Sequence, residues 1–284
     1  MSRLKHVKEF LGTGTGTEGS LLIPKKIHDM LIEEVDKALI PRAEAGWFFG
    51  PGDIPGSSID LNLVTPNSMD VRVVAEGAEI PLDQAEYTSI NLKPKKYGVA
   101  IRITRELLED AKWNLLQHNI GVAGKRMAEN ENSLIVSDAL DNASNTVAGG
   151  AAITIANITR AMQYLEDSDY EPTTFFVGME VMNDLRNIDT FVEFNKVGNR
   201  DMLASGFLGT IYGMNVIKVS TNAGMTTTSS YVTDKRHAYA IAEKRPLTVE
   251  NFELESYDMS AAAITHRLKV RQVRAEAIAK ITTT

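Results

Sequence analysis

The sequence contains no cysteine. This absence excludes disulfides, thiolate metal sites and cysteine nucleophiles together. No apolar run approaches the ~20 residues that a membrane-spanning helix needs. The basic first residues are followed by no apolar segment of the kind found in secretory signals. We therefore expect a protein with no membrane partner, made in a cytoplasm-like compartment or packed into a particle there.

Familiar catalytic and cofactor motifs are also missing. The five histidines form no H-E-x-x-H pattern, and neither a P-loop nor G-x-S-x-G is present. Gly14, Gly16 and Gly19 do match G-x-G-x-x-G. A dinucleotide site needs a buried strand before these glycines and a helix directly after them, and the flanking residues offer neither. The pattern therefore favours a flexible arm, and we expect no cofactor and no metal.

Two carboxylates and one basic cluster remain as candidates for chemistry. Glu76 and Glu79 lie close together between prolines, with nothing to raise the pKa of one of them as an acid–base pair requires. We expect them to be solvated or paired with lysines of a neighbour. The cluster Lys93–Lys96 lacks interleaved aromatic residues and lies in a chain of net charge −7, which argues against nucleic-acid recognition. A charged strand edge is the simpler interpretation.

What the sequence does contain is an unusual amount of extended chain in its first half. An alternating Gly-Thr tract at 12–19 precedes a short amphipathic helix expected at 24–39, where Pro24 suits a first turn. Residues 59–103 then alternate apolar and polar side chains, with Pro66 and Pro81 as interruptions. We expect a long two-stranded arm, which has little core of its own and needs support from another subunit.

The second half predicts a mixture of helices and strands. A long helix is expected from Thr104 to Leu140, with a charged face that includes Glu131, followed by a loop at 141–150. Helices at 155–165 and 179–188 alternate with strands at 173–177 and 213–219. From His237 onward the pattern is almost wholly strand-like. This order predicts an α+β fold in which the C-terminal strands return beside the long helix.

These stretches resemble the major capsid proteins of tailed viruses with the Hong Kong 97 fold. The likeness rests on Ala-Glu-Gly-Ala-Glu-Ile-Pro at 75–81, Ser-Ile-Asn-Leu-Lys-Pro-Lys-Lys at 89–96, and Val-Ala-Ile-Arg-Ile-Thr-Arg-Glu-Leu-Leu-Glu-Asp at 99–110. The stretch 206–219 looks like the family's approach to its last strands. The order of these motifs, from about residue 16 to 281, is more specific than any one of them.

The resemblance implies a shell protein that is not an enzyme, forming hexamers and pentamers of an icosahedral capsid around double-stranded DNA. It divides the chain into five parts: an N-terminal arm (1–45), an extended hairpin loop with its flanking strands (46–103), a peripheral domain with a long spine helix (104–150), an axial domain (151–232), and the C-terminal strands of the peripheral domain (233–284). The implied location is the virion, after assembly in the host cytoplasm. Scaffolding, portal and decoration proteins are implied as possible partners.

The same resemblance supplies candidate contact residues. Contacts between subunits are expected at Glu76, Glu79, Lys93, Lys95, Lys96, Asn195, Lys196 and Arg200. Three basic residues of the arm are candidates for the capsid interior: Arg3, Lys5 and Lys8. Some family members cross-link a loop lysine to an asparagine; Asn251 is of the right type, but we expect no such bond. Many family members carry an N-terminal scaffolding segment that a protease removes. Here only about 20 residues precede the expected arm helix, so either scaffolding is a separate protein or the chain is a processed or naturally short form.

Two other interpretations stay open at this point. A nanocompartment shell of the encapsulin type, built on the same fold, would hold a cargo enzyme instead of DNA. A cytosolic α/β enzyme using residues 151–232 would be a compact monomer or small oligomer with a pocket lined by polarised residues.

Overall fold

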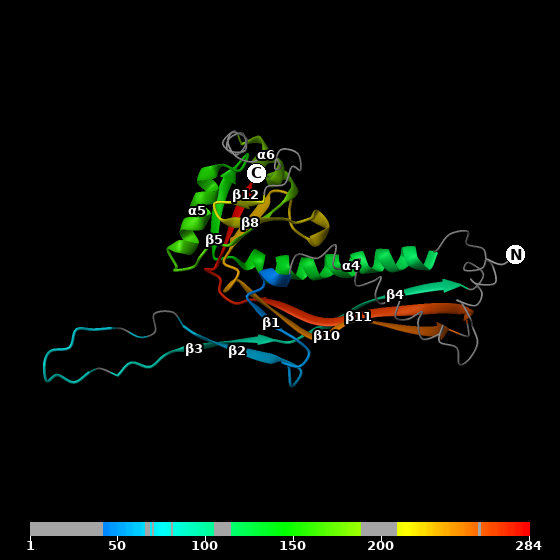
Figure 1. Cartoon of the computed structure of the whole chain (residues 1–284), viewed down its shortest axis with the longest axis horizontal. Helices are drawn as coiled ribbons and strands as arrows, with labels where there is room; N and C mark the ends of the chain where they lie inside the picture. Colours follow the sequence, from blue (N-terminus) through cyan, green and yellow to red (C-terminus); the bar gives the residue numbers. More distant parts are fainter. Residues whose placement is uncertain are drawn as a thin grey trace.

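The computed structural model describes residues 42–65, 69, 71–80, 82–104, 115–188, 209–254 and 257–284. A long helix lies along one β-sheet and reaches a second sheet at its C-terminal end, while a narrow hairpin projects away from both sheets (Figure 1). Helices and strands are segregated in space, so the architecture is α+β, as expected.

The larger sheet has six strands in the order β5-β12-β9-β6-β8-β7. The strands are β5 (Asn145–Gly150), β6 (Thr174–Val177), β7 (Thr210–Ile211), β8 (Met214–Lys218), β9 (Ser229–Thr233) and β12 (Ile278–Thr283). The central strand β6 is buried on both faces, since Phe175 and Val177 enter one apolar cluster and Phe176 enters another.

Helices α5 (Ile155–Glu166) and α6 (Met179–Asn187) cover one face of this sheet. Each has an apolar stripe at helical spacing, for example Ile158, Ala161 and Leu165 on α5, all fully buried. The Thr154 hydroxyl accepts a hydrogen bond from the Asn157 amide and caps the N-terminus of α5. The strands and helices expected at 155–188 and the strand expected at 213–219 are confirmed.

The second sheet has four strands in the order β1-β10-β11-β4. They are β1 (Trp47–Phe49), β4 (Lys95–Thr104), β10 (Tyr239–Leu254) and β11 (Met259–Gln272). The long pair β10–β11 is antiparallel, and its register shifts between Glu243 and Thr248. Helix α4 (Leu115–Asp138) runs along this sheet (Figure 1).

Helix α4 buries two separate apolar patches. Around the middle of the helix, Ala123, Met127 and Ala128 pack with Ile264 of β11. Near its end, Ile135 and Val136 join the cluster that also holds Phe176. The C-terminal strand β11 therefore does return beside the long helix, as the sequence predicted. The short 3-10 helix η2 (Leu140–Asn142) follows, and η3 (Thr221–Ala223) lies between β8 and β9.

The projecting hairpin pairs β2 (Ile59–Val64) with β3 (Tyr87–Leu92), six residues on each strand. Its base packs on the four-stranded sheet through Ile54, Leu61 and Leu92, which meet Ala240 and Ala242. Beyond the paired residues the chain extends as a long loop in Figure 1. A turn at its tip is closed by the Ala78 amide, which donates to the Ala75 carbonyl, and Gly77 takes φ +79° there.

Several expectations were wrong in detail. Thr104, expected as the cap residue of the long helix, is the last residue of strand β4. Residues 145–150 are a strand and not a loop, because they pair in parallel with β12. The expected return strand 87–103 is split: β3 pairs with β2, whereas β4 pairs with β11. The alternating run 71–74 forms no strand.

Sheet membership crosses the expected segment boundaries. Strand β5 lies within 104–150 and β12 lies within 233–284, yet both belong to the six-stranded sheet with the strands of 151–232. The expected arm helix at 24–39, the start of the long helix at 105–114, and the loop around 195–201 lie outside the described residues.

Candidate subunit-contact site

The loop between β2 and β3 displays apolar side chains to solvent. Val71 and Val73 are fully exposed, and the other large apolar residues of the loop and its ends are also exposed: Val64, Met69, Val74, Ile80, Leu82 and Tyr87. Isolated exposed apolar residues are ordinary, but a contiguous group of this size marks an interaction surface. The loop therefore has the character of a segment that is buried only against another molecule.

Acidic side chains lie among these apolar residues. Glu76 lies within the turn at the tip and Glu79 directly follows it, and both are exposed. Arg72 lies 3.6 Å from Asp83 across the loop, so one basic and one acidic residue partly neutralise each other there. An exposed pair of this kind contributes little stability. Because Glu76 and Glu79 add negative charge, the loop presents a surface that is both apolar and acidic.

A basic surface lies where the hairpin joins the four-stranded sheet. Lys93, Lys95 and Lys96 are exposed, whereas Pro94 between them is buried. Lys95 and Lys96 begin β4, an edge strand, opposite Leu268 and Arg267 of β11. Lysines on an edge strand oppose unwanted strand pairing and leave a cationic site for an acidic partner.

Three cationic side chains bind backbone carbonyls of the hairpin and of the segment that leads into it. Lys244 donates to the carbonyl of Ile54, Arg271 to that of Asn91 at 3.2 Å, and Arg274 to that of Val64. Hydrogen bonds from charged donors are stronger than neutral ones. Together with the apolar cluster beneath, they fix the direction in which the loop projects.

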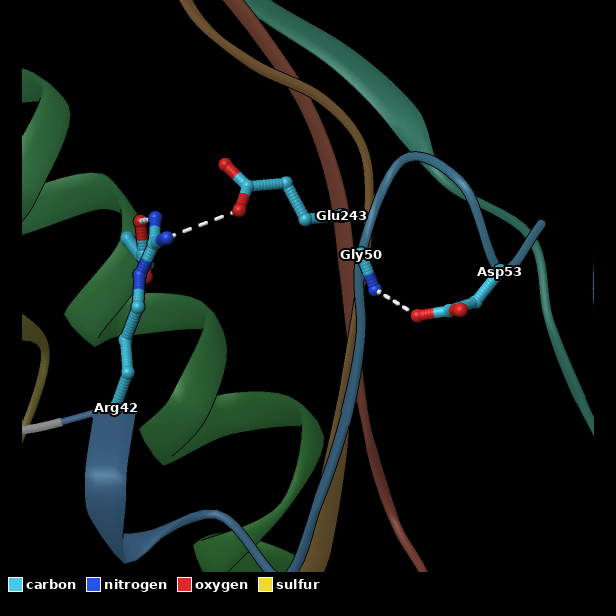
Figure 2. Close-up of polar contacts among 5 residues, drawn as sticks. Arg42, Gly50, Asp53 and Glu243 are labelled. Atoms are coloured by element: carbon cyan, nitrogen blue, oxygen red, sulfur yellow. Dashed lines mark hydrogen bonds and ion pairs between the residues drawn. The ribbon is translucent and has the colours of Figure 1, made fainter.

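A buried ion cluster connects three other parts of the fold. Arg42, in the 3-10 helix η1 (Arg42–Glu44), donates two hydrogen bonds to the carboxylate of Glu131 on α4, at 2.8 and 2.9 Å. Its remaining nitrogen donates to Glu243 of β10 at 3.0 Å (Figure 2). The Glu131 and Glu243 side chains are only 2% and 8% exposed. Sequence analysis placed Glu131 on the solvated face of the helix, which is wrong.

Polar side chains without partners surround this cluster. Within the described residues, neither the Tyr239 hydroxyl nor Nε2 of His266 has a hydrogen-bond partner. Burial lowers the pKa of His266, opposed by the charge of Glu131, so the neutral ring is favoured. On the other side of β10, the Gly50 amide donates to the Asp53 carboxylate at 2.8 Å and closes the turn that leads from β1 toward the hairpin (Figure 2).

A family model described as phage capsid protein matches residues 86–281, well over half of the chain. The chain belongs to the phage capsid protein family. It is a major capsid shell protein, and its family is one of structural proteins. No curated relative matches the chain.

Solved structures from phages agree with this assignment at the level of the fold. A chain of Microbacterium phage Oxtober96 aligns with a TM-score of 0.65 and 15% identity, covering 86% of this chain and 91% of that one. A chain of Mycobacterium phage Che8 gives 0.67 and 15%, covering 80% and 84%. The asymmetric unit of the bacteriophage PhiM1 mature capsid gives 0.66 and 9%, covering 87% of each chain.

This capsid protein therefore has the Hong Kong 97-like fold, which the sequence motifs had indicated. The family and the matching phage capsids favour a viral shell over the nanocompartment. Among the residues placed by the structure, no group of three or more histidine, aspartate or glutamate residues could hold a metal ion. None of the described helices has the length and apolarity that a membrane crossing requires.

The capsid protein's candidate contact residues are only partly described. Glu76 and Glu79 lie on the loop, while Lys93, Lys95 and Lys96 lie at the sheet edge, so the two groups occupy separate surfaces. The other candidates lie outside the described residues: Arg3, Lys5, Lys8, Asn195, Lys196 and Arg200. Sequence reasoning missed Arg42 and Glu243, and the one available signal was a charged residue at 131 between apolar positions of the helix.

Proposed function

We propose that this capsid protein forms the hexamers and pentamers of a closed icosahedral shell that encloses the double-stranded DNA of a tailed virus. One observation carries the proposal: the loop between β2 and β3 holds fully exposed Val71 and Val73 on a segment that projects away from the chain's own core. A soluble monomer gains nothing from such a surface, whereas a subunit that lays the loop on its neighbour buries it.

The two charged surfaces suggest how neighbours recognise each other. Glu76 and Glu79 at the loop tip would meet Lys93, Lys95 and Lys96 of an adjacent subunit. The donor and acceptor surfaces are different parts of the same chain, so the contact is of the head-to-tail type, which generates a ring when the rotation closes. Each contact can be weak, because closure of the shell repeats it many times.

The remaining parts of the chain receive roles by the same family likeness. Residues 1–45 would form the arm and 46–103 the extended loop with its strands; 104–150 and 233–284 would form the peripheral domain, and 151–232 the axial domain. Asn195, Lys196 and Arg200 would lie near the centre of each ring of subunits. Arg3, Lys5 and Lys8 would face the interior, where a net charge of −7 keeps the contact with DNA weak.

Assembly in the host cytoplasm, with scaffolding, portal and decoration proteins as possible partners, completes the proposal. Its test is electron microscopy of the purified full chain, expressed alone or with a scaffolding protein. Closed shells, or rings of five and six subunits, are expected. A homogeneous monomer or dimer under both conditions would contradict the proposal.

The role of the loop can be tested separately. The Thr65 amide donates to the Glu86 carbonyl at 2.8 Å, so the two ends of the loop are already adjacent. Replacing residues 66–85 with Asn-Gly would close the hairpin with a tight turn and leave β2 and β3 intact. We expect a folded subunit that no longer forms stable shells. Shells of normal size and stability would show that the loop does not hold neighbours together.

A further inference from the structure

Arg42, Glu131 and Glu243 come from three distant parts of the chain and meet between the two apolar patches of helix α4. Glu131 lies one turn after Ala128, which belongs to the first patch, and one turn before Ile135, which belongs to the second. A buried carboxylate at such a position is unfavourable unless a cation accompanies it. The cation is supplied by η1, a 3-10 helix outside both sheets.

The charges of the cluster do not balance. One guanidinium serves two carboxylates, and both carboxylates are more than nine-tenths buried. The Arg42 side chain is 34% exposed, so solvent reaches it from one side only. Its guanidinium also lies 5.9 Å from the ring centre of Phe48 on β1, within the range of a cation–π contact. Arg42 thus contacts α4, β10 and β1 at once.

The sheet is irregular at the same place. The register of β10 against β11 shifts between Glu243 and Arg245, and again between Arg245 and Thr248. Arg245 bridges this interval with a hydrogen bond to the Thr265 hydroxyl at 3.0 Å, but its Nε has no partner among the described residues. The regular ladder between β10 and β11 is interrupted here, so side-chain contacts carry more of the attachment between these two strands.

We propose that Arg42 is a charge latch: the contact between the C-terminal half of α4 and the four-stranded sheet holds only while η1, the segment that carries Arg42, is seated on them. If that segment moves away, Glu131 and Glu243 remain buried side by side without a cation. Breaking a buried ion pair by removing one partner is far more destabilising than replacing the whole pair. The position of η1 is thereby coupled to the order of helix α4.

The latch responds to acid in a defined direction. Burial raises the pKa of Glu243, opposed by Arg42 and reinforced by Glu131. As the pH falls, the folded chain therefore takes up a proton at Glu243 before the unfolded chain does, and this site then favours folding. Protonation also removes the charge that Arg42 neutralises. The other ionisable groups packed around the cluster are Glu44 on η1, Tyr97 on β4, Tyr239 on β10 and His266 on β11.

His266 also affects how the Arg42 variant and wild type differ in acid, and it acts in the same direction as Glu243. Its lowered pKa makes acid unfavourable for the folded chain, since the buried ring resists protonation. The charge of Arg42 contributes to that lowering. Removing Arg42 therefore eases protonation of His266 as well as of Glu243. Both effects shrink the difference between wild type and an Arg42 variant as the pH falls.

The test is hydrogen exchange of the full chain, read by mass spectrometry over residues 124–138 and 239–250 and corrected for the intrinsic exchange rate at each pH. Arg42→Met removes the charge and keeps most of the side-chain length. We expect exchange in both segments to accelerate at least about tenfold at pH 7.5, because two buried carboxylates lose their cation. At pH 5 the ratio to wild type should fall toward one.

A triple variant separates charge from packing. Arg42→Met with Glu131→Gln and Glu243→Gln removes the charge at all three positions of the cluster, so its exchange should return close to the wild-type rate at both pH values. Arg126→Met is the matched control, because Arg126 pairs with Glu129 on the same helix but is 70% exposed; its exchange should not change. An Arg42→Met effect that is independent of pH, or a triple variant as labile as Arg42→Met, would overturn the latch. If Arg42→Met does not fold, a folded triple variant supports the proposal and an unfolded one contradicts it.

Discussion

The guanidinium of Arg42 forms a two-pronged hydrogen-bonded ion pair with Glu131, a residue 89 positions away in the sequence. The pair joins the first described residues of the chain to the middle of its longest helix. Because the contact spans so much of the sequence, it exists only when both the N-terminal segment and the helix–sheet unit are in place. The presence of the Arg42–Glu131 ion pair therefore indicates that the subunit is completely folded.

The exposed valines of the loop should matter for assembly and not for folding. Val71→Asp with Val73→Asp should leave the unfolding midpoint of the subunit unchanged, since both side chains are already fully exposed. The critical concentration for shell formation should rise by roughly tenfold or more, because charged groups would have to be buried at the contact. Light scattering against concentration measures this. Val71→Ile with Val73→Ile is the control and should assemble; normal assembly of the aspartate variant would remove the loop from the contact.

Charge reversal should show whether the loop tip and the sheet edge meet. Glu76→Lys with Glu79→Lys should block assembly, and so should Lys95→Glu with Lys96→Glu, because like charges would face each other across the contact. Combining all four changes should restore shells, which electron microscopy would reveal. If each pair blocks assembly and the combination fails to restore it, the acidic tip binds a different surface.

The buried ring of His266 predicts a loss of stability in mild acid. Its folded pKa lies below the ordinary value of 6.5, so the unfolded chain binds the proton more readily. Stability from this group is complete above pH 6.5 and is lost as the pH falls through the lowered pKa. In His266→Gln, the urea midpoint of the full chain should fall less between pH 7 and pH 5 than in wild type. Parallel curves for the two proteins would argue against a role for this ring.

Close contacts with the backbone of Lys235 and Arg236 should make Gly46 intolerant of any side chain. A Cβ atom at this position would lie 2.2 Å from the carbonyl oxygen of Arg236, a rigid backbone atom. Gly46→Ala should therefore lower the free energy of unfolding by roughly 2–3 kcal/mol, since the chain before β1 must move away from the turn that precedes β10. Gly52→Ala is the matched control, because nothing lies within 4 Å of its Cβ, and it should be close to neutral. Thermal unfolding of both variants decides the point.

Sequence periodicity predicted the helices and strands whose buried face is determined by their own residues. The spacing of Ile158, Ala161 and Leu165 located α5, and the alternation at 59–63 located β2, because both elements bury one face determined by their own residues. Strand β5 was missed for the opposite reason. Its polar and glycine-rich residues have no strand pattern, and they are extended only because β12 lies beside them.

The contact surfaces divide in the same way. Exposure of Glu76, Glu79 and the three lysines follows from charge and turn signals near them, so the sequence sufficed to predict their exposure, while their role in contacts stays a prediction. The burial of Glu131 depends on Arg42, and no periodicity within the helix records a partner so distant in the sequence. Amphipathic patterning assigns such a charge to solvent by default.

The pairing of β12 with β5 places Ala279 beside Asn145 in a parallel ladder. Parallel pairing between such distant residues requires closure of a large loop before any hydrogen bond of the ladder forms, and chains dominated by contacts of this kind fold slowly. Shell formation therefore has two successive steps: the folding of each subunit and its association with other subunits. Wherever folding is the slower of the two steps, a change in folding speed alone would alter how quickly shells appear, even with every contact between subunits unchanged.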